Sequence, residues 1–243
     1  MKPFLLLATR AEDLAADDEY LEFMNSGELK ERDLERRRLE RDPLGEVDLD
    51  RYSGLILGGS PYTITEPEHV KSAAQLRVES EMLTLLDEIV DRDYPFLGAC
   101  YGIGLIGRHQ GALVDRTYPE PVGATMLRLT DDGRSDPLFG ILPEEFEAFL
   151  GHKEAISKLP DHAVHLASSA DCPVQAFRVG QNVYATQFHP ELDVPGIQNR
   201  IDIYKDYGYF APTEAQGLKD AAARANVVHP PTLVKRFVEL YAR

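Results

Sequence analysis

Three short apolar runs in the first hundred residues constrain the fold more than any other feature. They cover residues 2–8 (KPFLLLA), 55–57 (LIL) and 94–100 (YPFLGAC), and each stops at small or polar residues. Short apolar runs bounded by turn signals are typical of strands buried on both faces. Helical spacing follows each run, so the chain reads strand, helix, strand, helix, strand, helix. That order predicts a mostly parallel sheet with helices on both faces.

Apolar spacing predicts two helices between these strands. The first is expected within residues 11–27, where Gly27 is a plausible stop, and the second over residues 68–91. The stripe expected to be buried in the second helix consists of Val70, Ala74, Val78, Met82, Leu85, Leu86 and Ile89; the looser pattern in the first consists of Leu14, Tyr20, Leu21 and Met24. The charged segment 29–49 between them fits either a polar edge strand or more helix.

The second half of the chain has a different pattern. Short strands are expected within residues 123–130, 147–152, 163–169, 174–182 and 183–191, separated by Gly, Pro, Asp and Asn. Such strands predict antiparallel pairing at the edge of the sheet, with a hairpin over residues 178–185. After Pro195 the chain is expected to be helical, with helices within 213–226 and 231–243. We therefore expect one domain over residues 1–195 and a helical extension of it over 196–243.

Composition excludes several classes of function. A net charge of −15 repels nucleic-acid phosphates and anionic lipids, so we expect neither as a partner. The first apolar run is too short for a signal peptide, and no segment approaches the length of a membrane span. Two cysteines, Cys100 and Cys172, imply no disulfide framework. We expect a cytoplasmic protein with reduced thiols, no cofactor and no metal site.

Cys100 stands on a turn between a strand and a helix. In the sequence Gly98-Ala99-Cys100-Tyr101-Gly102, glycines lie two residues to each side of the cysteine. This is the nucleophile-elbow pattern, in which only small side chains fit beside the nucleophile. A thiol at the positive end of a helix favours the thiolate, and the Tyr101 N–H is free for a developing oxyanion. The alternative is a buried cysteine acting only as a small apolar residue.

Two further segments fit the same chemistry. His189 and Glu191 follow an expected strand, and period-two alternation would place both side chains on one face. Glu191 would then orient His189 towards a thiol, as in a catalytic triad, although such a pair is also common on surfaces. The loop Gly58-Gly59-Ser60 follows another strand, and its Gly59 N–H is the best candidate for a second oxyanion donor. In open α/β sheets such strand ends meet at one edge.

Together these motifs resemble the class I, triad-type glutamine amidotransferases. The residues that carry the resemblance are "GACYG", "QFHPE", the "ILGGSP" loop and the segment "GHKEAISKLP" at 151–160, and they look most similar to the amidotransferase domain of GMP synthetase. The resemblance implies a three-layer, flavodoxin-like α/β fold. It also implies that Cys100 attacks a glutamine carboxamide, that His189 transfers the proton, and that Glu191 orients His189. A glutamyl thioester would follow. The same resemblance makes Gly58, Ser60, Gly104, His152 and Lys153 candidate substrate contacts, with a purely structural histidine as the alternative for His152.

One position departs from the family pattern. The family elbow reads G-x-C-x-G-x-Q, and this chain has Gly104 where that substrate-binding glutamine stands. The substrate is therefore expected to be glutamine or another γ-glutamyl compound. The chain also has no Gly-rich phosphate loop, so it would either deliver ammonia to a separate synthetase subunit or act alone as a γ-glutamyl hydrolase.

Several alternatives stay open from the sequence. One is another α/β enzyme with an elbow cysteine and protease or deglycase activity. A second is a non-catalytic regulatory relative that kept the fold. A homo-oligomer is also open, and the aromatic group at residues 204–210 would either form an interface or pack on its own domain.

Overall fold

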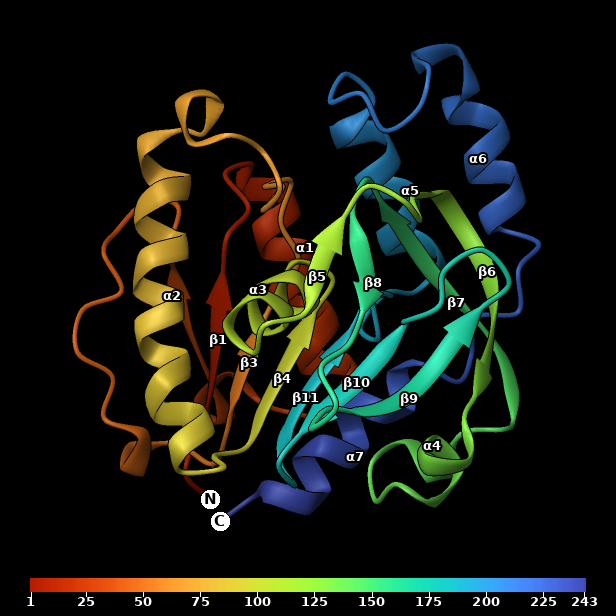
Figure 1. Ribbon diagram of the computed structural model, residues 1–243. Helices are drawn as coiled ribbons and strands as arrows, with labels where there is room; N and C mark the ends of the chain where they lie inside the picture. The colour runs from red at the N-terminus through yellow and green to blue at the C-terminus, as the bar shows by residue number, and fades with distance from the viewer.

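A computed structural model describes residues 1–243 as a central mixed sheet covered by helices (Figure 1). The sheet has nine strands in the order β2-β1-β3-β4-β11-β10-β9-β6-β7. Its strands are β1 (Phe4–Ala8), β2 (Leu34–Arg38), β3 (Leu55–Leu57), β4 (Phe96–Ala99), β6 (Glu120–Leu129), β7 (Glu145–His152), β9 (Val164–Ser169), β10 (Ala176–Val179) and β11 (Val183–Thr186). The helices are α1 (Asp13–Ser26), α2 (Ala73–Asp91), α3 (Tyr101–His109), α4 (Asp131–Ser135), α5 (Val194–Tyr204), α6 (Ala215–Ala222) and α7 (Pro231–Tyr241).

The sheet confirms the expected division between parallel and antiparallel parts. Strands β2, β1, β3, β4 and β11 pair in parallel, and β10, β9, β6 and β7 continue the sheet as antiparallel neighbours. The predicted hairpin is β10–β11. The charged segment after α1 contains the edge strand β2, one of the two alternatives that the sequence allowed. A separate two-stranded sheet, which the sequence pattern did not predict, pairs β5 (Leu113–Asp115) with β8 (Ala155–Lys158).

Period-two alternation divides the core between the two faces of the sheet. On β1, Leu5 and Leu7 belong to the core cluster that contains α2 and α3. Phe4 and Leu6 belong to the opposite cluster, which contains Phe23 of α1 and Phe237 of α7. These two clusters make the three layers that the sequence predicted. No helix of the protein is both long enough and apolar enough to cross a membrane.

The α2 helix is shorter than the sequence predicted. It begins at Ala73 because the Ser72 side chain caps it, accepting a hydrogen bond from the Gln75 N–H. Glu68–Val70 forms a separate 3-10 turn, and Val70, expected on the buried stripe, is 57% exposed. Lys71 between them has extended backbone, so the two segments are not one helix.

The α1 helix follows only part of the apolar pattern read from its sequence: Tyr20 and Met24 pack against the core, but the two leucines do not. Leu14 is 73% exposed and Leu21 is also exposed, whereas Glu19 and Glu22 are buried with Phe23. The two glutamates lie one turn apart on one face of α1. Glu19 forms an ion pair with the buried Arg10, and Glu22 forms one with the buried Arg200 of α5. A helix face occupied by paired charges cannot be recognised from hydrophobic spacing.

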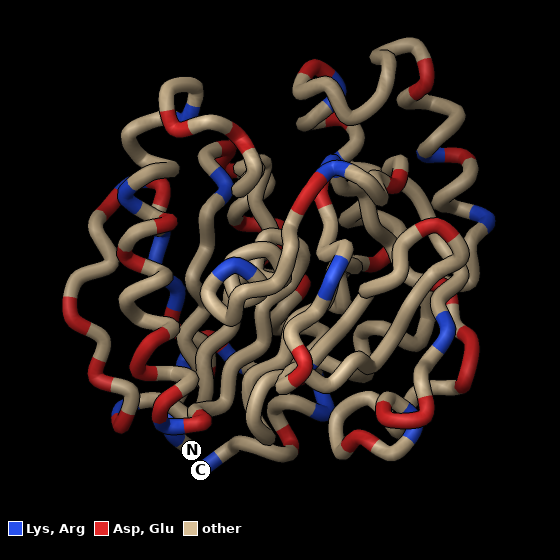
Figure 2. The backbone as a smooth tube through the Cα atoms, viewed as in Figure 1, with Lys and Arg blue, Asp and Glu red and all other residues tan.

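The helices of the C-terminal segment pack at two separate places on the rest of the protein. Helices α5 and α6 form a third, smaller core cluster with Phe149 and Leu192, at the upper right of Figure 1. Helix α7 packs on the sheet, and the Lys2 N–H donates to the Arg243 carbonyl at 2.5 Å, so the two termini meet (Figure 1). Acidic residues lie around the whole periphery, as Figure 2 shows.

Candidate active site

Cys100 occupies a strained turn between β4 and α3. Its φ of 51° and ψ of −87° place it in a region that residues with a side chain rarely adopt. The turn is tight because a Cβ at Gly98 would lie 3.0 Å from the Gly102 Cα. Tyr101 is the first residue of α3, so its N–H has no acceptor within the helix. The side chain of Cys100 is half-buried.

His189 reaches the same place because β11 lies beside β4. The two strands are parallel with Thr186 opposite Ala99, so the segments that follow them leave the sheet together. His189 Nδ1 lies 2.8 Å from Glu191 Oε1, and both side chains are buried. The strand ends at Thr186, so the expected strand alternation does not align these side chains. The irregular segment after β11 brings them together instead, held by the His189 N–H on the Phe149 carbonyl.

Charges around His189 favour its protonated form. Burial lowers its pKa, but Glu191 and Cys100 outweigh burial and raise that pKa to about 9, with a hydrogen bond to Cys100 contributing. Burial raises the pKa of Glu191, because it disfavours the charged carboxylate, but His189 and Arg200 outweigh burial and lower that pKa to about 2. The arrangement therefore allows an imidazolium at His189 that pairs with the Glu191 carboxylate.

Arg200 of α5 joins this group and was missed by the sequence analysis. Its guanidinium donates to Glu191 at 3.0 Å and to Glu22 at 2.6 Å, and it lies 3.0 Å from His189 Nδ1. Burial is the largest of the causes that raise the pKa of Glu22 to about 7. No local pattern marks an isolated arginine in the C-terminal segment, so only the packing of α5 on α1 reveals it.

The Gly58-Gly59-Ser60 loop differs from expectation because the Gly59 N–H already has a hydrogen-bond acceptor. The Gly59 N–H donates to Glu19 Oε1 at 3.0 Å, so it is not free for a substrate in this conformation. Glu19 in turn accepts from Arg10 Nε at 2.8 Å. A Cβ at Gly59 would lie 2.5 Å from both Arg10 and the His189 ring, so the loop approaches the histidine as closely as glycine permits.

Ile64 fills the space beside Gly104. A Cβ at Gly104 would lie 2.7 Å from Ile64 Cδ1, and Glu154 accepts from the Ile64 and Thr65 N–H groups at 2.7 and 2.8 Å. These hydrogen bonds fix the loop that contains Ile64 and Thr65 across the face of α3 from which the family's glutamine side chain would project. The Lys153 ammonium lies beside the site, where it donates to the Tyr207 carbonyl at 3.0 Å and lies 4.3 Å from the centre of the Tyr209 ring.

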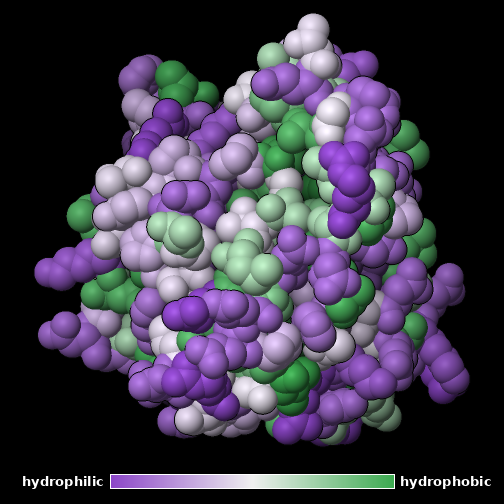
Figure 3. All heavy atoms as spheres, turned by 90° about the vertical axis from the view of Figure 1, so that its right-hand side faces the viewer, coloured by the Kyte–Doolittle hydropathy of each residue, from purple (hydrophilic) through white to green (hydrophobic).

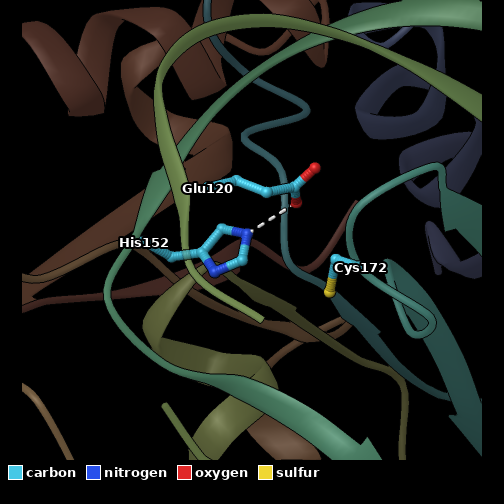
Figure 4. Close-up of side chains that lie close together, drawn as sticks. All are labelled: Glu120, His152 and Cys172. Atoms are coloured by element: carbon cyan, nitrogen blue, oxygen red, sulfur yellow. Dashed lines mark hydrogen bonds and ion pairs between the residues drawn. The ribbon is translucent and has the colours of Figure 1, made fainter. Parts of the chain in front are cut away.

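Both ring nitrogens of His152 bind within the protein. Nε2 lies 2.8 Å from Glu120 Oε2 (Figure 4). Nδ1 lies 3.0 Å from the Glu154 carbonyl, and the two contacts together support the structural alternative for this histidine. Glu120, His152 and Cys172 form the one group with metal-ligand spacing. However, Glu120 also accepts from Ser169 and Gln175, and burial raises the pKa of the Cys172 thiol to about 12. These contacts favour a hydrogen-bonded support over a metal site or a second nucleophile.

Two cavities meet at Cys100. We call them the polar cavity and the apolar cavity; both touch Ser60, Cys100, Gly151 and Tyr209. Tyr101, His152, Lys153 and Glu154 line only the polar cavity, whereas His189 and Arg200 line only the apolar one. Tyr204 and Tyr209 thus pack on their own domain, next to the site.

This three-layer α/β fold places a cysteine elbow beside a buried His–Glu pair. Residues 28–197 match the family model for glutamine amidotransferase class I, so the chain belongs to that family. It is 34% identical over 162 residues to one subunit of the glutamine-hydrolyzing GMP synthase of Thermoplasma acidophilum, and this match covers 66% of this chain and 72% of the relative.

Other relatives are longer or more distant in sequence. The chain is 32% identical over 150 residues to the glutamine-hydrolyzing GMP synthase of Borreliella burgdorferi, but this covers 62% of the chain and only about a quarter, 26%, of that relative. A glutamine amidotransferase structure from Thermotoga maritima has the same fold, with a TM-score of 0.79 over 99% of this chain and 98% of that one, at 21% identity. The structural likeness therefore includes the C-terminal helices, whereas the family match ends at residue 197.

Proposed function

We propose that this class I glutamine amidotransferase cleaves a γ-glutamyl amide through a thioester on Cys100. The observation that carries the proposal is that Cys100 and His189 line one cavity, while the buried Glu191 carboxylate lies 2.8 Å from His189 Nδ1. Glutamine is the simplest substrate with this chemistry. The relatives named for glutamine hydrolysis support the choice of amide.

The proposed reaction has two balanced halves. Cys100 Sγ attacks the amide carbon, forming a C–S bond, while the Tyr101 N–H stabilises the negative oxygen. The C–N bond then breaks, and His189 gives the leaving nitrogen the proton it took from the thiol. Water attacks the thioester with His189 accepting its proton, the C–S bond breaks, and the proton returns to Sγ. Glu191 keeps the ring of His189 in place throughout, so it acts as a positioning residue.

We further propose that, where glutamine is the substrate, the ammonia it releases passes to a separate synthetase subunit. The proposal is supported by the Thermoplasma relative, which is named as one subunit of a synthase. The Gly59 N–H becomes a second oxyanion donor only when its hydrogen bond to Glu19 breaks, which is a step that a partner or substrate could drive.

Ammonia release from glutamine tests the proposal, with Cys100→Ala and Cys172→Ala as matched variants. Cys100→Ala should abolish release, and Cys172→Ala should retain it, because Cys172 is buried away from the shared cavities. Persisting release in folded Cys100→Ala protein contradicts the proposal, as does its loss in a folded Cys172→Ala variant alone.

A further inference from the structure

The apolar cavity is larger and less polar than the departure of ammonia requires. It has a volume of about 60 Å³, which is room for several water-sized molecules, and it is partly open to solvent. Its wall consists mainly of Val122, Leu150, Leu192, Ile197, Ile201 and Phe210. Leu192, Ile197 and Ile201 belong to the small core cluster around α5 and α6, and Val122 and Phe210 pack against it. Figure 3 shows apolar residues among hydrophilic ones in the upper half of this side of the molecule.

The positions of the reacting groups assign one part of the substrate to each cavity. His189, which gives its proton to the leaving nitrogen, lines the apolar cavity and not the polar one. Tyr101, whose N–H holds the oxyanion, lines the polar cavity and not the apolar one. Because His189 lines the apolar cavity, we place the leaving nitrogen, and any group that it carries, on the apolar side of Cys100.

The arginines of the apolar cavity have their charges paired. Arg10 binds Glu19 at 2.8 Å, and Arg200 binds Glu22 and Glu191 at 2.6 and 3.0 Å. A carboxylate entering this cavity would lose its hydration without gaining an unpaired cation. An uncharged, apolar group has no comparable hydration to lose, and its transfer from water into the cavity is favourable.

The apolar cavity also continues towards solvent. It shares Val122, Tyr209 and Phe210 with a surface groove that runs along α6 past Glu214 and Leu218. A substituent longer than the cavity therefore has a route outwards, between β6 and α6.

We propose that the preferred substrate is a γ-glutamyl amide whose nitrogen carries an apolar alkyl or aryl group, which leaves through the apolar cavity as a primary amine. This inference rests on the proposed function and names its substrate class. The C–N bond breaks as His189 protonates the amine, and water releases glutamate from Cys100, so one water is consumed per amide. Glutamine is the smallest member of the series.

A substrate series tests the inference with the full-length protein. Glutamate release is measured for glutamine and for γ-glutamyl methylamide, butylamide and isopentylamide. The value of kcat/KM should rise by about fourfold for each methylene that enters the cavity. γ-Glutamyl-leucine and γ-glutamyl isopentylamide differ only by a carboxylate, and the neutral amide should react at least about tenfold faster.

Two variants and a control link this preference to the cavity. Val122→Phe should fill the cavity and lower the isopentylamide-to-glutamine ratio of kcat/KM by about tenfold. Met126→Phe adds the same ring to the same strand, where Met126 is 53% exposed, and should leave the ratio unchanged. Phe210→Ala removes part of the wall and should also lower the ratio, which keeps the test valid if Val122→Phe does not fold.

The outcomes separate the two claims. If no amide, glutamine included, is hydrolysed in a Cys100-dependent way, the proposed function itself fails. If glutamine is hydrolysed and the N-substituted amides are no faster, only the present inference is overturned. Faster turnover of γ-glutamyl-leucine than of the isopentylamide also overturns it, since the cavity would then recognise a carboxylate.

Discussion

At the scale of single residues, the account depends on contact between Cys100 and His189. Because Cys100 is one of the groups that raise the pKa of His189 to about 9, Cys100→Ala should lower that pKa. An NMR titration of the histidine ring in both proteins measures the difference. The matched Cys172→Ala variant should leave the midpoint in place, and an unchanged midpoint in Cys100→Ala would show that the thiol does not act on the ring.

The same pKa shift makes stability depend on pH. A histidine with a raised pKa in the folded state contributes stability below its ordinary pKa of 6.5 and loses it as pH rises through about 9. In this window the unfolding free energy should fall by on the order of 3 kcal/mol more in the native protein than in His189→Gln. Denaturant titrations at pH 6 and pH 9.5 measure this, and equal pH dependence in the two proteins would contradict it.

Arg200 provides a second prediction at this scale. Arg200→Met leaves the buried carboxylates of Glu22 and Glu191 without their cation, which should cost about 3–5 kcal/mol of unfolding free energy. Arg200→Lys keeps the charge but not the geometry of the guanidinium, so this variant should lose less unfolding free energy than Arg200→Met. Urea denaturation compares the variants; an Arg200→Met protein as stable as the native one would refute the pairing.

At the scale of elements, the packing of α3 against β4 sets the elbow. A Cβ at Gly102 would meet Leu57 at an ordinary 3.6 Å, whereas one at Gly98 would lie 3.0 Å from backbone. Gly102→Ala should therefore be neutral or stabilise by up to about 1 kcal/mol, through helix propensity. Gly98→Ala should destabilise by about 1–3 kcal/mol. Thermal unfolding tests the pair, and the reverse order would show that the turn is not held by this contact.

Sequence patterns predicted elements well where a single face is buried and poorly where charges pair. The parallel strands and the β10–β11 hairpin carry strong apolar or turn signals, so their positions were predictable. The pattern of α1 misleads because its buried face presents Glu19 and Glu22 to arginines from distant segments. The start of α2 was predicted too early, because Val70 matches the helical stripe but lies before the Ser72 cap.

At the scale of the whole molecule, α7 completes the core on one face of the sheet. The Phe237 ring is fully buried against Phe4 of β1, with ring centres 5.9 Å apart. Phe237→Ala should cost about 3–5 kcal/mol of unfolding free energy. Phe237→Leu should cost less. A near-neutral Phe237→Ala in urea denaturation would show that α7 is not part of the cooperative core.

Tertiary packing also decides which residues of the site could be predicted from the sequence. The side chains of the elbow and of the His-x-Glu pair stand in motifs with short spacing, so they could be proposed from the chain alone. Arg200 and Tyr209 come to the site only because α5 and the segment after it fold back over the ends of the strands. The hydrogen bond that occupies the Gly59 N–H likewise depends on α1, some 40 residues away in sequence.

The most direct test of the central claim is to identify the cysteine that carries the acyl group. The protein is mixed with glutamine or γ-glutamyl isopentylamide, quenched in acid during turnover, digested and analysed by peptide mass spectrometry. A glutamyl adduct on the peptide containing Cys100, and none on the peptide containing Cys172, is the predicted result. Turnover with the adduct on Cys172 instead, or undiminished turnover in Cys100→Ala, would contradict the account.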